Sequence, residues 1–280
     1  MHKIIISILL FCNVAVSQFA TTTRQQQYQK ESYTVFGAMT TLYNGDRKRI
    51  MDSLVFRLKR DTIWSTRDVI YIFANLDSNQ AKINWKTPGT FNITTVATVT
   101  FTADQGYAGN GSTGYMKTGY IPFDTASHFG KINDMQADIY NRSTTQQNVY
   151  DFGALSNSNH SFALDIKDAG NIYMLVNDGT FSAIGNANAQ GFYSMNRTAY
   201  NTRTLYRNGS SVGTQTVNSL PAPPNVEIFI HSRNNAGAPN LFSTKQFSFF
   251  SVGSSLSATK ISSFNTDVEW YMDRLGTGVQ

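Results

Sequence analysis

The feature that most constrains the fold is a run of short alternating segments between residues 85 and 253, separated by turns rich in Asn and Gly. Alternation of apolar and polar residues with a period of two is typical of strands that have one face on a core. Many such strands in succession indicate two antiparallel sheets packed face to face. We therefore predict a mainly β protein whose residues 85–280 form a two-sheet antiparallel jelly-roll sandwich. The predicted strands span residues 91–94, 98–102, 114–118, 135–140, 149–155, 161–167, 172–176, 191–197, 202–207, 226–231 and 246–252.

Turn residues separate several of these strands and suit tight hairpins. Ala169-Gly170, Asn177-Asp178-Gly179 and Asn208-Gly209 contain residues that tolerate positive φ.

A C-terminal amphipathic helix closes the sequence at residues 257–275. Ser257 is a suitable N-cap and Gly276 a suitable stop. Its apolar residues recur at spacings of three and four: Ile261, Phe264, Val268, Tyr271 and Leu275. We expect this helix to cover an edge or a face of the sandwich.

A small helical segment is predicted before the sandwich, at residues 36–84. Ile50, Leu54 and Leu58 form one apolar stripe, and a second short helix is expected from Ser65 to Phe73. The polar stretch at residues 18–35 is predicted to be a flexible leader.

The first 17 residues are typical of an export signal. Lys3 precedes an apolar run at residues 4–11, and small residues at Ala15 and Ser17 favour cleavage before Gln18. The run is shorter than the roughly 20 residues that span a bilayer, so no membrane span is expected after cleavage. Removal of the signal also removes Cys12, the single cysteine. A secreted or extracellular surface location follows as an expectation, with a virion surface as one form of it.

Charge gives no support for a nucleic-acid partner. The chain has 23 Lys and Arg against 18 Asp and Glu, an excess too small and too scattered for a phosphate-binding face.

Three strings resemble the concanavalin A-like lectin/glucanase superfamily, in particular the laminin-G-like jelly rolls of bacterial and bacteriophage surface proteins. They are the Gly-rich turn and strand at residues 106–119, the hairpin Leu205-Tyr206-Arg207-Asn208-Gly209, and the closing strand at 246–253 that leads into the last helix. The resemblance implies the jelly-roll fold and covers lectins, hydrolases and structural modules. It also implies a possible cofactor, calcium, held at a loop rim by Asp151 or Asp178.

A catalytic centre is not indicated by the motifs. The Glu-x-Asp-x-Glu strand of the glucanases, which supplies paired carboxylates, does not occur, and no Gly-x-Ser-x-Gly nucleophile motif is found. Glu227 and His231 fall on one face of a predicted strand and could form an acid/base pair. Whether the protein is an enzyme is left open, with a non-catalytic role favoured.

With no catalytic motif indicated, ligand recognition is the function that we consider next. Sugars bind where aromatic ring faces and a few polar groups line a concavity. The loop Arg233-Asn234-Asn235 is polar and follows a predicted strand end, and residues 185–188 form a similar loop. We expect Tyr140, Asp151 and Tyr193 to line the adjoining sheet.

These observations favour a non-catalytic carbohydrate-binding or adhesion module with a glycan or polysaccharide partner. One alternative is a structural or assembly protein of a phage tail or cell envelope, in contact with copies of itself or with other surface or virion proteins. Another is a divergent glycan hydrolase or lyase that uses Glu227.

Overall fold

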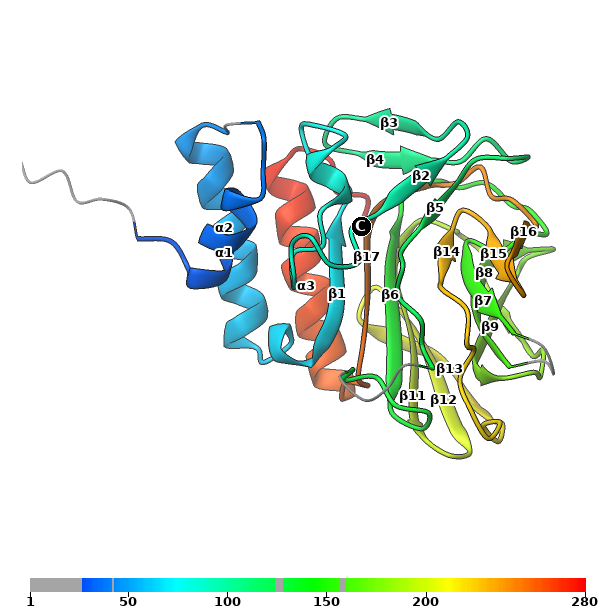
Figure 1. The fold of residues 1–280 in the computed structure, drawn as a ribbon. Coiled ribbons are helices and arrows are strands. Elements are labelled where there is room, and N and C mark those ends of the chain that lie inside the picture. Colours follow the sequence, from blue (N-terminus) through cyan, green and yellow to red (C-terminus); the bar gives the residue numbers. More distant parts are fainter. Residues whose placement is uncertain (1–26, 42, 124–127, 157–159) are drawn as a thin grey trace, which may run out of the picture.

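The computed structural model describes residues 27–41, 43–123, 128–156 and 160–280, so the predicted export signal lies outside the described residues. The fold has three layers: a helical layer, a sheet beneath it and a second sheet beyond that one (Figure 1). The mainly β, two-sheet antiparallel sandwich predicted from the sequence is confirmed. The helices are α1 (Lys30–Gly37), α2 (Gly45–Arg60) and α3 (Ala258–Arg274), with short 3-10 helices η1 (Trp64–Thr66) and η2 (Gln80–Lys82).

The sheet next to the helices, sheet A, has eight strands in the order β13-β12-β11-β6-β17-β4-β3, with β1 also paired to β17. The other sheet, sheet B, has the order β10-β9-β8-β7-β14-β5-β2, with β15 paired to β7 and β16 paired to β15. The strands of sheet A are β1 (Arg67–Ile72), β3 (Thr100–Thr102), β4 (Gly106–Ala108), β6 (Met135–Asn141), β11 (Gly191–Ala199), β12 (Thr202–Arg207), β13 (Ser210–Thr216) and β17 (Gln246–Gly253). Those of sheet B are β2 (Thr94–Val96), β5 (Tyr115–Lys117), β7 (Phe152–Leu155), β8 (Ser161–Asp168), β9 (Asn171–Asp178), β10 (Ala183–Gly185), β14 (Phe229–Ile230), β15 (Arg233–Asn235) and β16 (Ala238–Asn240).

The central strands of sheet A are buried on both faces. Every residue of β6 is buried, and Ile139 faces the core between the sheets while its neighbour Tyr140 faces the helices. In β17, Phe250 likewise faces the core between the sheets and Phe249 faces the helices. Alternating side chains of one strand therefore serve two separate cores, as a strand between two layers requires.

The helical layer covers the outer face of sheet A with the apolar stripes that the sequence indicated. Leu54 and Leu58 of α2 are fully buried, as are Ile261 and Phe264 of α3. The Ser257 hydroxyl accepts a hydrogen bond from the Lys260 N–H at 3.4 Å, which confirms the predicted N-cap. Among the described residues, none of the helices combines the length and the apolar character needed to cross a lipid bilayer.

The segment from Ser65 to Phe73 differs from its prediction, because β1 is a strand. Val69 and Tyr71 face the core between the sheets, and Ile70 and Ile72 face the helices. A strand buried on both faces is apolar at successive positions, so it lacks the alternation that identifies a half-buried strand. The predicted helical segment 36–84 is therefore helical in α2 and contributes a strand to sheet A. Residues 30–37, placed mostly in the flexible leader, form α1.

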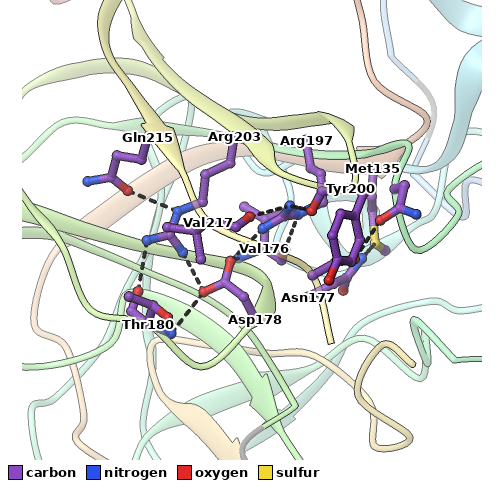
Figure 2. Close-up of polar contacts among 12 residues, drawn as sticks. Met135, Val176, Asn177, Asp178, Thr180, Arg197, Tyr200, Arg203, Gln215 and Val217 are labelled. Atoms are coloured by element: carbon purple, nitrogen blue, oxygen red, sulfur yellow. Dashed lines mark hydrogen bonds and ion pairs between the residues drawn. The ribbon is translucent and has the colours of Figure 1, made fainter. Parts of the chain in front are cut away.

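A buried ion cluster joins the two sheets near the end of β9 (Figure 2). Asp178 of sheet B accepts hydrogen bonds from Arg197 and Arg203 of sheet A, at 2.8 and 2.5 Å. Arg197 also donates to the backbone carbonyls of Val176, Tyr200 and Val217. The cluster ties three strands together at one end of the sandwich.

Candidate functional site

A pocket of about 270 Å³ opens on the face of sheet B that points away from sheet A. Phe162 and Leu164 of β8 face the central core, so the alternating residues Ala163 and Asp165 face outward. We call this site the Tyr150 pocket. It is lined by Asn148, Val149, Tyr150, Asp165, Asp168, Tyr173, Phe181 and Leu241.

Regular pairing fixes the walls of the Tyr150 pocket. Asp165 of β8 lies opposite Tyr173 of β9 in the antiparallel ladder, so a carboxyl group and a phenol ring stand side by side on one face. The Tyr150 N–H donates to the Leu241 carbonyl at 3.1 Å, which brings the loop after β16 against the loop before β7. Phe181 is 57% exposed and forms an open apolar side of the pocket.

Asp165 is the most unusual group in this site. Its side chain is buried, and one oxygen, Oδ1, accepts the Lys167 N–H at 3.2 Å. Burial raises the pKa of Asp165 to about 8, and the nearby Asp151 carboxylate adds to the increase. The Lys245 ammonium acts in the opposite direction but does not offset burial. The raised pKa favours the protonated form of Asp165, which can donate a hydrogen bond.

Arg233 is the one residue of the predicted binding loop that the structure brings close to the pocket. Its guanidinium carbon lies 4.3 Å from the centre of the Tyr150 ring, in cation–π geometry. Asn234 is buried and bonds to the Glu227 carbonyl and the Gly237 N–H, which holds the β15–β16 hairpin. Asn235 is exposed on the same hairpin.

Tyr140 and Tyr193 do not line a ligand-facing surface, which corrects the sequence-based assignment. Both lie in sheet A and are buried on its opposite faces. The Tyr140 hydroxyl donates to Glu269 of α3 at 2.7 Å. The Tyr193 hydroxyl, between the sheets, donates to the Asn188 carbonyl at 2.9 Å. The alternation in the sequence predicted these strands. It could not show that a helical layer covers the outer face of sheet A.

Asp151 is also buried, and its carboxylate forms hydrogen bonds with interior groups. Its Oδ1 atom accepts hydrogen bonds from Lys245 at 3.0 Å and from Ser243 at 2.7 Å, and its Oδ2 accepts the Ile166 N–H at 2.8 Å. Asp151 affects the Tyr150 pocket indirectly, through its charge on Asp165.

A calcium ion does not fit the two aspartates that the family resemblance suggested. The Asp151 carboxylate already forms an ion pair with the buried Lys245. The Asp178 carboxylate already forms ion pairs with two buried arginines, Arg197 and Arg203. Calcium needs six to eight oxygen ligands. Within residues 27–41, 43–123, 128–156 and 160–280, no three His, Cys, Asp or Glu side chains gather in a metal-binding group.

Glu227 and His231 do not form the acid/base pair that their predicted place on one strand face suggested. The strand β14 covers only Phe229–Ile230, and His231 has a φ of +66°, which turns the chain. His231 is fully buried and stacks on Phe247 at 4.7 Å. Burial lowers the pKa of His231 to about 3, and its ring stays neutral. Glu227 instead accepts the Gly119 N–H at 2.8 Å.

Sequence reasoning missed Tyr150, Tyr173 and Phe181 as members of the site. One signal was available, because β8 has the pattern Ala163-Leu-Asp165, in which a carboxyl interrupts the outward positions of an apolar strand. The loops that complete the pocket are close only through sheet pairing and the β15–β16 hairpin.

The sequence matches no protein-family model, and no curated protein matches it. Among solved structures, the chain is similar to a mutant Trypanosoma rangeli sialidase that displays trans-sialidase activity, with a TM-score of 0.53 and 12% identity over 83% of this chain and 40% of that one. It is also similar to the binding domain of botulinum neurotoxin serotype D, with a TM-score of 0.52 and 13% identity over 73% of this chain and 51% of that one. The chain thus spans about half or less of these structures. At such identities the likeness shows a shared β-sandwich fold.

Proposed function

We propose that this protein is a non-catalytic carbohydrate-binding module of the concanavalin A-like, laminin-G-like type, exported from the cell or carried on a virion surface. The observation that carries the proposal is the Tyr150 pocket, where exposed ring and alkyl surface meets carboxyl groups on an outward face of the sandwich. Two proteins that share the fold are a sialidase and a toxin receptor-binding domain, which supports a glycan as the partner.

The composition of the pocket suits a sugar. A pyranose ring has apolar C–H faces that pack on aromatic rings, and hydroxyl groups that need a few fixed polar partners. Tyr173 and Phe181 supply the rings, and Asp165, Asp168 and Asn148 supply the polar partners. The volume lies just below the range of about 300–1,000 Å³ for drug-sized ligands, so the pocket suits one terminal sugar residue with the rest of the chain outside.

Binding to a glycan array tests the proposal, followed by calorimetry with the best ligand. Phe181→Ala and Tyr173→Ala are expected to weaken binding by about fivefold or more, since stacking on an aromatic ring contributes about 1–3 kcal/mol in the recognition of nucleic-acid bases. Tyr200→Ala is the matched control, because Tyr200 is 55% exposed and does not line the pocket. No binding to any glycan, with or without calcium, would contradict the proposal. Equal loss in the control variant would also contradict the pocket as the site.

A further inference from the structure

We propose that the Tyr150 pocket is one end of a longer binding surface on sheet B, where Arg233 and Phe242 bind the next residues of the same glycan. The ligand is then a linear oligosaccharide rather than a single sugar. This inference rests on the proposed carbohydrate-binding function. The pocket volume of about 270 Å³ suits one sugar residue, so further residues of a chain would lie on the surface beside it.

The outward face of sheet B connects the pocket with Arg233. Phe152 of β7 faces the core between the sheets, so its neighbour Gly153 faces outward, where it pairs with Ala163 of β8. A Cβ atom at Gly153 would lie 3.2 Å from Cγ of Arg233, which pairs with Gly153 between β15 and β7. The alkyl stem of Arg233 therefore lies against a position without a side chain. From there the guanidinium carbon lies 4.3 Å from the centre of the Tyr150 ring, and Tyr150 lines the pocket.

Most hydrogen-bond donors of Arg233 are unused within the part of the chain that the structure describes. A guanidinium group has five N–H donors. In that part of the chain, only Nε–H forms a hydrogen bond, to Oδ1 of Asn240 at 3.3 Å, and no ion pair involves Arg233. The residue is partly exposed, so the remaining donors are open to a ligand. Hydroxyl oxygens of a sugar accept such hydrogen bonds, and the positive charge of the donor strengthens them.

Phe242 adds an apolar ring to this surface. It follows Leu241, which lines the pocket and is 42% exposed. The Phe242 ring packs against the Tyr115 ring of β5, with 6.2 Å between the ring centres. Tyr115 faces outward from sheet B, because its neighbour Met116 faces the core between the sheets. Phe242 is partly exposed, so it offers a ring on which the C–H face of a sugar can pack.

One short segment, residues 240–242, ties both groups to the pocket. Asn240 accepts the hydrogen bond that orients Arg233. The Leu241 carbonyl accepts the Tyr150 N–H at 3.1 Å, and Phe242 comes next. A chain with one residue in the pocket therefore meets hydrogen-bond donors and an apolar ring beside it. These are the two kinds of contact that a second sugar residue needs.

The test is a chain-length series. The glycan array carries linear chains of glucose, galactose, xylose and N-acetylglucosamine, each from one to four residues long, and calorimetry measures the series that binds. We expect the affinity to rise at least about tenfold from the single sugar to the trisaccharide, which corresponds to about one charge-assisted hydrogen bond. Equal affinity for these two ligands, or binding of single or branched sugars alone, would overturn the inference and leave the carbohydrate-binding function standing. If no glycan on the array binds, the proposed function itself fails.

Variants separate a contact with a second sugar from support of the pocket. Arg233→Gln should lower the affinity for the trisaccharide at least about tenfold and the affinity for the single sugar much less. Phe242→Ala should reduce the gain with chain length in the same way. Arg274→Gln is the matched control and should change no affinity, because Arg274 also stacks on an aromatic ring, Trp270, but belongs to α3.

Equal weakening of all chain lengths by Arg233→Gln would show that Arg233 only supports Tyr150, and it would overturn the inference. Circular dichroism checks that each variant is folded. If Arg233→Gln does not fold, Arg233→Lys replaces it, because lysine keeps the charge and most of the alkyl stem. Arg233→Lys should still lose most of the gain with chain length, since an ammonium group lacks the planar fork of N–H donors. An unchanged gain in Arg233→Lys would overturn the inference.

Discussion

The Asp178 carboxylate of β9 lies 2.8 Å from the Arg197 guanidinium of β11, and the pair connects the two sheets without contact with solvent (Figure 2). Arg203 of β12 shares the same carboxylate. Two guanidinium groups and one carboxylate give the buried cluster a net positive charge. Burial lowers the pKa of both arginines, and Asp178 offsets part of this effect. The fold therefore depends on one carboxylate to hold two buried cations.

Removal of that carboxylate should be costly. We predict that Asp178→Asn lowers the free energy of unfolding by about 3–5 kcal/mol, because it leaves two buried guanidinium groups without their counter-ion. Urea unfolding followed by circular dichroism measures the change. Asp46→Asn breaks an exposed pair with Arg49 on α2 and should cost less than about 1 kcal/mol. Similar losses in the two variants would show that the cluster does not join the sheets energetically.

Asp178 also illustrates what the sequence does not reveal. The sequence Asn177-Asp178-Gly179 predicts a hairpin turn because these residues tolerate positive φ, and Asn177 does have a φ of +58°. The partners of Asp178 lie 19 and 25 residues away and belong to the other sheet. Residue type alone did not distinguish a turn aspartate from a buried counter-ion, since that distinction depends on which strands face each other.

Regular elements with one exposed face were predictable, and those that contact two layers were less so. The stripe of α3 is a local pattern, and the structure confirms it. β1 is apolar at consecutive positions because it separates two cores. The sequence of β1 therefore shows no alternation of apolar and polar residues with a period of two.

The candidate site was predictable in part, for a similar reason. Arg233 was identified from its polar loop and lies beside the Tyr150 pocket. Tyr140 and Tyr193, which are expected from the sequence to line the sheet beside the binding loop, are both buried in sheet A. Only the sheet register shows that Tyr173 accompanies Asp165 on the outward face.

Stability should fall as pH rises through the range in which Asp165 ionises. Burial raises the pKa of Asp165 in the folded protein to about 8, against about 4 in an unfolded chain. Between these values the folded state binds a proton that the unfolded state does not, so the free energy of unfolding decreases with rising pH. Below about pH 4 both states are protonated and the effect vanishes.

Asp165→Asn isolates this contribution. We predict that the variant gains stability relative to the wild type, on the order of a few kcal/mol, as pH is raised from about 4.5 to about 8.5. Urea unfolding at a series of pH values gives the difference directly. Parallel curves for the two proteins would mean that Asp165 ionises normally in the folded state.

Gly106 and Gly237 form a matched pair for the effect of close packing. Both have positive φ, +97° and +101°, so an alanine at either position is strained by about 1–2 kcal/mol. A Cβ atom at Gly106 would overlap the carbonyl of Phe247, whereas one at Gly237 would meet no atom within 4 Å. Gly106→Ala should therefore cost about 2 kcal/mol more than Gly237→Ala in thermal or urea unfolding. Equal costs would show that β4 shifts without penalty.

We predict that Phe264 contributes much of the free energy that holds α3 against sheet A. Its ring is fully buried and contacts Phe192 of β11 and Phe249 of β17, at centroid distances of 5.3 and 5.6 Å. Phe264→Ala leaves a cavity between the helix and the sheet and should lower the free energy of unfolding by about 3–5 kcal/mol. Phe56→Ala on α2 removes a ring that is 50% exposed and should change it by less than about 1 kcal/mol. Urea unfolding of both variants, with the slope m unchanged, separates lost packing from a change in the unfolded chain. A Phe264→Ala loss as small as that of Phe56→Ala would mean that α3 is held by its polar contacts, such as the bond between Tyr140 and Glu269, rather than by its apolar stripe.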